Sequence, residues 1–487
     1  MSEKSKKLGV FALAALVISA MIGGGIFSMP QNIAQGASVM AVIAAWVISG
    51  IGIFFLASTF RILAEIQPDA TAGIYAYSRI GFGKFAGFQI AWAYWLCNIF
   101  GNVAYAVLLM DAMNYFFPGT FTGGNNLWSV IGGSLVIWLM NFAVLRGTRQ
   151  AAGINTVGTI CKLIPLAIFI VVMIFVFRWK TFSTDMFGTE TIPALELKPL
   201  GSFLGQIKST MMVTLWAFIG IEGAVVISAG AESQQAVGRA TMIGFLGCLS
   251  IYILLSLLPF GRMTQGELAA LNNPSTAELL QNAVHGKWGG VLMNLGVIIA
   301  LLTSWLAFTI MIAQIPYAAA KDGTFPGIFA HENHCGAPDV SLFVTSAIMQ
   351  LTMIMVYFAN NAWNTMLSIT SVMILPPYFG CTLYLWKRCA AKNYPATASV
   401  KLGFATLCGV AGSIYALWMI YAAGLEYLAM AFIFLALGIP VFIWAQKNAG
   451  TGEKQKLFTG IELASAILIV LIALLAIIAA VTGKLSL

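Results

Sequence analysis

Two short segments of the sequence combine glycines with a helix-breaking pattern, and both lie inside long apolar runs. The first holds Gly23, Gly24 and Gly25, a few residues before Pro30. The second is WAFIGIEG at 216–223, in which two glycines flank an acidic residue. Glycines at this density weaken a helix and leave backbone amides and carbonyls without intrahelical partners. In an apolar environment such groups occur only where they line a cavity or are buried in protein, so both segments indicate a binding site.

The chemistry of these two breaks suits a zwitterion. A helix that begins at a break presents free N–H groups and a positive dipole to a carboxylate, and carbonyls across the gap can accept from an ammonium. We expect the amides of residues 23–25 to hold the carboxylate, and the carbonyls of Met21, Trp216 and Ile219 to face the amino group. The alternative is that the glycines only allow close helix packing, which is common in membrane proteins.

Two charged residues lie in the middle of apolar runs. Glu222 belongs to the second break, and Lys162 lies within NTVGTICKLIP at 155–165. An ionisable group at this depth is costly and therefore marks a functional position by default. The alternative is that both are satisfied buried groups. Asp111, near the end of another apolar run, is explained by solvation at the mouth of the protein.

The composition excludes a water-soluble protein. The 487 residues are 60% hydrophobic and only 9% charged, which is too little charge to cover a surface exposed to water. The net charge of +8 does not indicate nucleic-acid binding, because no run of Lys or Arg exceeds two residues. The seven cysteines lie mostly in apolar segments, which favours reduced thiols over a disulfide framework.

Spanning helices follow from the length of the apolar runs. A bilayer core of about 30 Å needs roughly 20 apolar residues in a helix. The thirteen segments that we predict to span are 9–36, 39–63, 84–116, 127–145, 154–177, 203–229, 239–260, 285–320, 341–358, 362–386, 402–422, 427–446 and 459–481. The run after the basic residues 1–7 is too long for a signal peptide, so we take it as the first span. Most of the 25 Lys and Arg residues then share a side with the amino terminus, which we predict to be cytoplasmic.

Enzyme signatures are not visible in the sequence. The segment 331–335 contains metal-ligand residue types but lacks the HEXXH spacing, and the glycines of 81–87 miss the dinucleotide fingerprint. No P-loop, nucleophile elbow or paired carboxylates occur. We therefore expect neither an enzyme, nor a cofactor, nor a metal site, and the remaining alternative to a carrier is a channel.

Four motifs together resemble the amino acid–polyamine–organocation (APC) superfamily, in particular the bacterial basic amino acid antiporters of the arginine/ornithine and arginine/agmatine type. These motifs are GGGIFSMP at 23–30, AYWLCNIFGN at 93–102, WAFIGIEG at 216–223 and AAAKDGTFPGIFA at 318–330. The resemblance implies an all-α integral membrane protein of the LeuT-type fold, with 12–13 transmembrane helices of which the first and sixth are broken.

The same resemblance implies how the chain is organised. A single transporter domain, 1–487, would contain a 5+5 inverted repeat, with repeat one at about 9–177 and repeat two at about 203–386. The additional helices at about 402–481 would lie outside the repeat. The two breaks would then occupy matched positions, facing one cavity near the bilayer midplane.

The resemblance also assigns a substrate-binding wall. Trp216 matches the gating aromatic of the sixth helix, and Trp305 matches an aromatic of the eighth helix that packs against the cationic end of the substrate. Cys97, Asn98 and Asn102 match the wall near the distal end of the substrate. Either Ser368 or Thr370 would complete this wall. A cation over an indole ring gains about 0.5–2 kcal/mol.

Coupling roles are implied for the two buried charges. Glu222 matches a glutamate proposed as a proton-sensitive switch in the family, and Trp216 would gate the site. Lys162 matches a lysine that occupies the place where sodium-coupled members of the fold bind their ion, which argues against sodium coupling.

The function that follows is exchange of a cationic amino acid (arginine, lysine or histidine) for ornithine or a decarboxylated amine by alternating access. A proton-coupled amino acid symporter is the alternative. The expected place is the bacterial inner membrane, the expected partners are lipid and small amine substrates, and a homodimer is left open.

Overall fold

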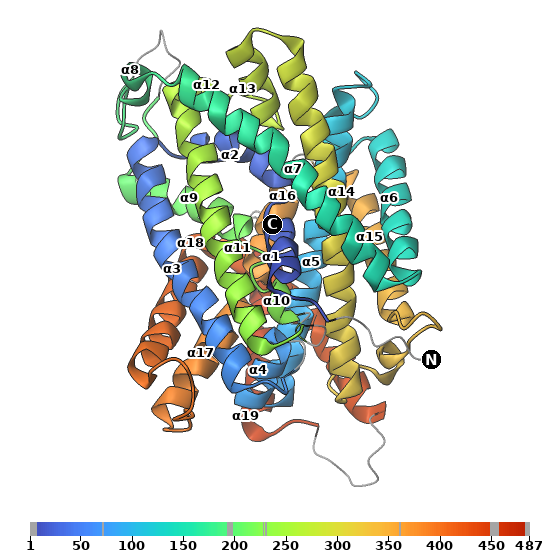
Figure 1. Ribbon diagram of the computed structural model, residues 1–487. Coiled ribbons are helices and arrows are strands. Elements are labelled where there is room, and N and C mark those ends of the chain that lie inside the picture. The colour runs from blue at the N-terminus through green and yellow to red at the C-terminus, as the bar shows by residue number, and fades with distance from the viewer. Residues whose placement is uncertain are drawn as a thin grey trace.

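Figure 1 shows the computed structural model of the chain, which describes residues 7–70, 73–191, 198–226, 228, 231–359, 362–448 and 457–482. Every regular element in these ranges is a helix, and the one β contact is an isolated bridge between Leu8 and Ala231. The structure therefore confirms the predicted all-α architecture.

The long helices carry most of the apolar residues. They are α3 (Val39–Ile66), α5 (Lys84–Asn114), α6 (Leu127–Leu145), α7 (Thr148–Val176), α11 (Gln234–Leu257), α14 (Lys287–Lys321), α15 (Asp339–Val356), α18 (Leu402–Asn448) and α19 (Gly460–Val481).

Shorter helices complete the interrupted spans and the connections. They are α1 (Val10–Met21), α2 (Met29–Ala34), α4 (Ile74–Phe82), α8 (Trp179–Phe182), α9 (Phe203–Ala217), α10 (Gly223–Val226), α12 (Gln265–Ala269), α13 (Ser275–Val284), α16 (Ala362–Met373) and α17 (Leu375–Ala390). Among the 3₁₀ turns, η1 (Gly24–Ser28) connects α1 to α2.

The predicted spans reappear as helices, with breaks that change how they are counted. Within the described ranges, ten helical spans are long and apolar enough to cross a membrane, and the bent pair α1 and α2 (46° apart) adds one more. Helix α18 contains a break at Gly424 (φ 83°), which separates the predicted spans 402–422 and 427–446. The predicted span 203–229 corresponds to α9 and α10, although its residues 227 and 229 lie outside the described ones.

Helix α5 lies in the centre of the bundle, where nearly all of its side chains between Phe85 and Ala112 are buried. It packs against α4, α14 and α16, while α11 packs against both α1 and α3. The interrupted helix α1 also contacts α7 and α14, and α9 contacts α3 and α16. Residues 19–31 and 216–226, which contain the two breaks, are therefore all buried among other helices.

Helices α6, α7 and α19 lie toward the outside and present large apolar side chains. Leu135, Phe175 and Leu475 are each more than 60% exposed. Such a surface would be a liability in water but is what a lipid-facing helix requires. The chain is a multi-pass membrane protein, and the ends of its bundle differ in structure: α8, α12 and α13 lie at one end and α4 at the other (Figure 1).

The bundle with interrupted first and sixth spans agrees with the expected LeuT-type fold. The repeat boundaries at 9–177 and 203–386 stay a prediction, and so does the single-domain assignment.

Candidate functional site

The first break is a change of direction between α1 and α2. Helix α1 ends at Met21, Ile22 leaves the helical region (ψ 72°), and η1 begins at Gly24. A Cβ added at Gly23, Gly24 or Gly25 would overlap Tyr105, Leu301 or Trp216, respectively. The glycines therefore allow three neighbouring side chains to approach the backbone, which is the close-packing role. The N–H of Gly23 donates to the carbonyl oxygen of Met21 (3.0 Å), whereas the first N–H groups of η1 have no partner within that turn.

The second break follows α9 and contacts the first. Gly220 has a φ of 107°, a region that side-chain-bearing residues rarely adopt, and a Cβ there would lie 2.7 Å from Cβ of Ala20 and 3.1 Å from the backbone nitrogen of Met21. Glycine is required here both by the backbone conformation and by the approach of α1. The two interruptions are therefore packed directly against each other.

Tyr252 of α11 connects the two interrupted helices. Its hydroxyl oxygen lies 2.7 Å from the carbonyl oxygen of Met21 and 2.8 Å from that of Ala217, so it can donate to one of them at a time. These carbonyls belong to the last turns of α1 and α9, which have no intrahelical donors. The carbonyl of Met21, predicted to face a substrate amino group, has a protein donor in this conformation.

Lys162 of α7 is fully buried beside the end of α1. Its Nζ donates to the carbonyl oxygen of Ser19 (2.7 Å) and to the hydroxyls of Ser19 and Ser304 (2.9 Å each). The Ser304 hydroxyl also lies 3.1 Å from the carbonyl oxygen of Ile22. All three donors of the ammonium are used, so Lys162 stabilises the unpaired carbonyls at the end of α1.

Glu222 is fully buried in the second break. One carboxylate oxygen accepts from the hydroxyl of Tyr94 (3.0 Å), and the other accepts from the hydroxyl of Tyr378 (2.8 Å) and from the N–H of Gly220 (3.0 Å). The ion pairs among the described residues do not include Glu222 or Lys162. The two buried charges are thus satisfied separately, by neutral partners.

A small closed chamber lies beside the second break. Residues from four segments line it: Cys97, Asn98, Gly101, Asn102, Tyr105, Trp216, Ile219, Phe308 and Thr370. The side chains approach one another so closely that about 10 Å³ remains, about the room one water needs. In this conformation the chamber is therefore closed and has no room for a substrate.

Polar atoms in the chamber lack partners. Asn102 and Thr370 are only 1% and 2% exposed. The side-chain nitrogen and oxygen of Asn102 and the hydroxyl of Thr370 have no hydrogen-bond partner. A buried polar atom without a partner costs about 1–3 kcal/mol, so such atoms mark places where a ligand or water belongs. Asn98 differs, since its amide donates to the carbonyl oxygen of Tyr94 at 2.8 Å.

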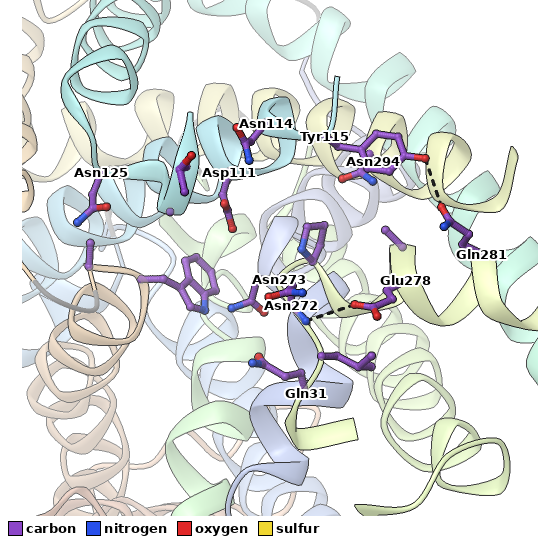
Figure 2. Close-up of a pocket in the computed structure, with 17 residues that line it drawn as sticks. Gln31, Asp111, Asn114, Tyr115, Asn125, Asn272, Asn273, Glu278, Gln281 and Asn294 are labelled. Carbon is purple, nitrogen blue, oxygen red and sulfur yellow. Dashed lines mark hydrogen bonds between the residues drawn. The ribbon is translucent and has the colours of Figure 1, made fainter. Parts of the chain in front are cut away.

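A pair of tryptophans separates the chamber from a larger cavity. The rings of Trp216 and Trp363 meet edge to face with their centroids 5.5 Å apart. Trp216 lines the chamber, and Trp363 lines a polar cavity of about 670 Å³ that we call the vestibule. Figure 2 shows the vestibule with Asp111 and Gln31 on facing sides. The vestibule lies at the end of the bundle that contains α13, opposite the end that contains α4 (Figure 1).

The end of the bundle near α4 is tied together differently. The hydroxyl of Tyr75 donates to the carboxylate of Asp322 and lies 2.8 Å from the hydroxyl oxygen of Thr324. Arg79 also lies 3.4 Å from the Asp322 carboxylate. These contacts join α4 to the segment after α14.

The structure brings together six of the predicted binding residues in the chamber lining and places others elsewhere. Trp305 is fully buried and does not line the chamber, whereas Phe308, one turn further along α14, does. Ser368 lies in a separate groove beside Lys208, so Thr370 is the one of the two alternatives that reaches the chamber.

Three lining residues, Gly101, Tyr105 and Phe308, were missed by the sequence analysis. Tyr105 lies one turn after Asn102 on α5, and Phe308 one turn after Trp305 on α14. Helical spacing of three residues from a predicted wall residue, which is Asn98 in the case of Gly101, would have found all three.

Comparisons with known proteins agree with the geometry. The family model described as amino acid permease matches residues 8–459. An arginine/agmatine antiporter of Chlamydia abortus is 55% identical over 489 residues, covering 100% of this chain and 99% of the relative. The arginine/agmatine antiporter of Chlamydia pneumoniae is 54% identical, with the same coverages of 100% and 99%, and that of Chlamydia trachomatis serovar L2 is 56% identical, with coverages of 92% and 91%. Because the family model matches residues 8–459 and the relatives match nearly the full length of the chain, the chain belongs to the amino acid permease family.

Proposed function

We propose that this protein exchanges a cationic amino acid, with arginine as the leading candidate, for agmatine, ornithine or a related amine across a bacterial inner membrane. The observation that carries the proposal is the closed chamber between two interrupted helices, with buried polar atoms that lack partners. The full-length similarity to arginine/agmatine antiporters supports the choice of substrates.

The chamber has the chemistry that a cationic amino acid needs. Asn102 and Thr370 offer hydrogen-bond acceptors to the donors of a guanidinium or ammonium group. Tyr105, Trp216 and Phe308 offer aromatic rings, and a cation over such a ring gains about 0.5–2 kcal/mol. In this conformation Phe308 presents the ring that we expected from Trp305.

The interrupted helices would bind the other end of the substrate. In our proposal the amides of Gly23, Gly24 and Gly25 hold the carboxylate when the chamber opens, and the carbonyls of Trp216 and Ile219 accept from the amino group. Opening has to move Trp216 away from Gly25, because its ring fills the space where a Cβ would lie.

Exchange follows from alternating opening of the two ends. Trp216 and Trp363 close the chamber toward the vestibule, and Tyr75 with Asp322 ties the opposite end. We propose that the first, second, sixth and seventh spans rock against the rest, so that only one end opens at a time. Obligatory exchange results if the protein reorients slowly without substrate.

Lys162 provides the argument on sodium. In sodium-coupled carriers of this fold a cation lies near the end of the first helix, and here the ammonium is within 2.7 Å of the Ser19 carbonyl oxygen. A fixed positive charge at that point would repel a second cation. We propose that transport is independent of sodium.

A proton-coupled symporter is the second candidate, and Glu222 is the observation that favours it. The carboxylate is fully buried without a cationic partner among the described residues, so a proton could bind there during transport. Protonation would remove acceptor capacity from the hydrogen bonds to Tyr94 and Tyr378, and this would couple the proton to the second break.

Proteoliposomes distinguish the two candidates. We expect radiolabelled arginine to enter vesicles loaded with arginine, agmatine or ornithine, and to enter empty vesicles at less than about one tenth of that rate. Replacing sodium by potassium should leave the rate unchanged. Uptake into empty vesicles driven by a proton gradient would establish the symporter, and sodium-stimulated uptake would refute the role of Lys162.

The orientation is part of the proposal. We place the amino terminus in the cytoplasm because most Lys and Arg residues then lie on the inner side. The vestibule then faces outward. A homodimer is an assembly that cross-linking in the native membrane would test.

A further inference from the structure

The vestibule is acidic and holds no basic residue in its lining. It lies between α2, α5, α13, α14 and α16, and its volume of about 670 Å³ is in the range of small-molecule sites. Its lining contains two carboxylates, Asp111 and Glu278, and neither a lysine nor an arginine. Figure 2 shows both carboxylates among a group of asparagine and glutamine side chains.

The two carboxylates have little neutralisation from the protein. Asp111 accepts a hydrogen bond from the backbone of Gly123, and a carboxylate oxygen of Glu278 lies 3.5 Å from the backbone nitrogen of Asn272. No Lys, Arg or His of the described residues lies within 4.0 Å of either carboxylate. Two negative charges therefore face one cavity without a cation.

A second and independent observation comes from neutral acceptors in the same wall. Gln31 is 8% exposed and Asn294 is 2% exposed, yet the side-chain oxygen of each has no hydrogen-bond partner. The amide nitrogen of Asn294 donates to the carbonyl oxygen of Gly290 at 2.9 Å, which fixes the side chain with its oxygen unpaired. Both oxygens belong to side chains that line the vestibule, where only a donor from a ligand or from water can satisfy them.

We propose that the vestibule is a second binding site, distinct from the chamber, that captures organic cations carrying guanidinium or primary ammonium groups. Such groups bring several N–H donors and a positive charge, which match two carboxylates and two unpaired acceptors. A doubly charged amine can contact both carboxylates at once, so the site favours it over a singly charged amino acid. The proposal rests on the proposed function only for the choice of cation.

The position of this site gives it a role in exchange. Trp363 is common to the vestibule wall and to the ring pair that closes the chamber. A cation held in the vestibule is thus one side chain away from Trp216, and its local concentration there is raised before the chamber opens. The expected consequence is a lower KM at this end of the protein only, because the opposite end has different residues.

Transport kinetics at the two membrane faces test the proposal. The variant Asp111→Asn/Glu278→Gln removes both charges, while the asparagine keeps an oxygen to accept from Gly123. With this variant we expect the KM for agmatine to rise roughly 10-fold and that for arginine roughly 3-fold in low salt, with kcat unchanged, when substrate is supplied to the vestibule face. The difference should shrink in high salt. Intact cells and inverted membrane vesicles present the two faces.

The matched control is Glu190→Gln. Glu190 is exposed in the segment between α8 and α9 and does not line the vestibule, so it changes the net charge without changing the site. A KM increase confined to one face of Asp111→Asn/Glu278→Gln and absent from Glu190→Gln supports the proposal. Equal changes at both faces, equal changes in the control, or no change overturn it.

Calorimetry separates this proposal from the proposed function. Titration of purified wild-type protein with agmatine should show a binding component that Asp111→Asn/Glu278→Gln loses and that Gln31→Leu weakens. If the wild type exchanges no arginine or agmatine, the proposed function is wrong. The vestibule proposal is then tested by the agmatine-binding component of the titration alone. A titration curve that is identical in wild type and double variant overturns the vestibule site.

Discussion

The two interrupted spans are stabilised by charges of opposite sign. At the end of α1, the ammonium of Lys162 donates to the carbonyl oxygen of Ser19 at 2.7 Å. In the second break, the carboxylate of Glu222 accepts from the N–H of Gly220 at 3.0 Å, just before α10 begins. The carboxyl end of a helix has unpaired carbonyls, which suit the ammonium of Lys162, and the break before α10 has an unpaired amide, which suits the carboxylate of Glu222.

The partners of these two charges differ in a way that bears on transport. Lys162 uses all its donors on two serines of α1 and α14. Glu222 is held by tyrosine hydroxyls of α5 and α17, so it connects the second break to two helices of the surrounding bundle. We infer that Lys162 mainly holds the fold of the first break, and that Glu222 links the second break to movement of its neighbours.

The largest expected effect is that of Lys162→Met. The substitution leaves the carbonyl of Ser19 and the hydroxyl of Ser304 buried with fewer donors, at a cost of about 2–3 kcal/mol in the free energy of unfolding. We expect exchange to fall more than about 100-fold and the thermal unfolding midpoint to fall, as measured in proteoliposomes and by scanning fluorimetry. The control Lys180→Met changes an exposed lysine of α8 and should have little effect. Normal stability of Lys162→Met would remove the proposed structural role.

Gly220→Ala should be the next most damaging change. It combines strain at a φ of 107° with overlap of the new Cβ and α1, for a combined cost of about 2–4 kcal/mol. Gly424→Ala is the matched control, because its φ is 83° but a Cβ there would meet nothing within 4 Å. We expect exchange activity and thermal stability to fall further for Gly220→Ala. Similar losses in both variants would mean that contact between the two breaks contributes nothing to exchange activity or to thermal stability.

Glu222→Gln should have a milder effect with a different character. The amide keeps one acceptor oxygen but turns the other into a donor that faces the hydroxyl of Tyr378 or Tyr94. We expect the maximum rate to fall less than about 10-fold, which corresponds to roughly 1.4 kcal/mol, and the pH dependence of exchange to flatten. Exchange rates measured from pH 5 to 8 test this. A pH profile parallel to that of the wild type would exclude Glu222 as the proton-sensitive group, and Tyr378→Phe controls for loss of one hydrogen bond.

Two neighbouring aromatic residues of α14 give the smallest and most selective effect. Phe308 lines the chamber and Trp305 does not, so Phe308→Leu should weaken arginine binding about 5-fold, as expected for loss of roughly 1 kcal/mol of cation–π attraction. Trp305→Leu should lower the folded yield and affect charged and neutral ligands alike. Calorimetric titration with arginine, ornithine and a neutral analogue measures both. If Trp305→Leu alone reduces binding of cations by 5- to 30-fold, the indole reaches the substrate when the chamber opens.

The sequence was sufficient for features that depend on local composition. Apolar runs of the right length predicted the spans, because a bilayer sets the length of a helix. The glycines of 23–25 and Gly220 predicted both interruptions, because few other residues tolerate such backbone. Lys162 and Glu222 stood out since an ionisable residue inside an apolar run is rare.

Features that depend on tertiary packing could not be predicted in this way. The hydroxyl of Tyr252 bridges two helices that are far apart in sequence, and nothing in its own segment indicates this. Phe308 lines the chamber and Trp305 does not because of how α14 is rotated about its own axis. Apolar periodicity does not define this rotation in a helix that is apolar on most sides. The presence of Asp111 and Glu278 in the lining of one vestibule likewise became visible only in the three-dimensional structure.

The most direct test of the chamber as the substrate site uses the native thiol of Cys97. This thiol lines the chamber and is 0% exposed, as is Cys408 of α18, which lies outside the chamber. Purified protein is treated with a small methanethiosulfonate reagent, and the modification rate at each cysteine is followed by mass spectrometry with and without arginine. We predict that Cys97 reacts as the chamber opens, that saturating arginine slows this reaction at least about 10-fold, and that Cys408 is unaffected. Modification of Cys97 at the same rate with and without arginine would contradict a substrate site between the two breaks.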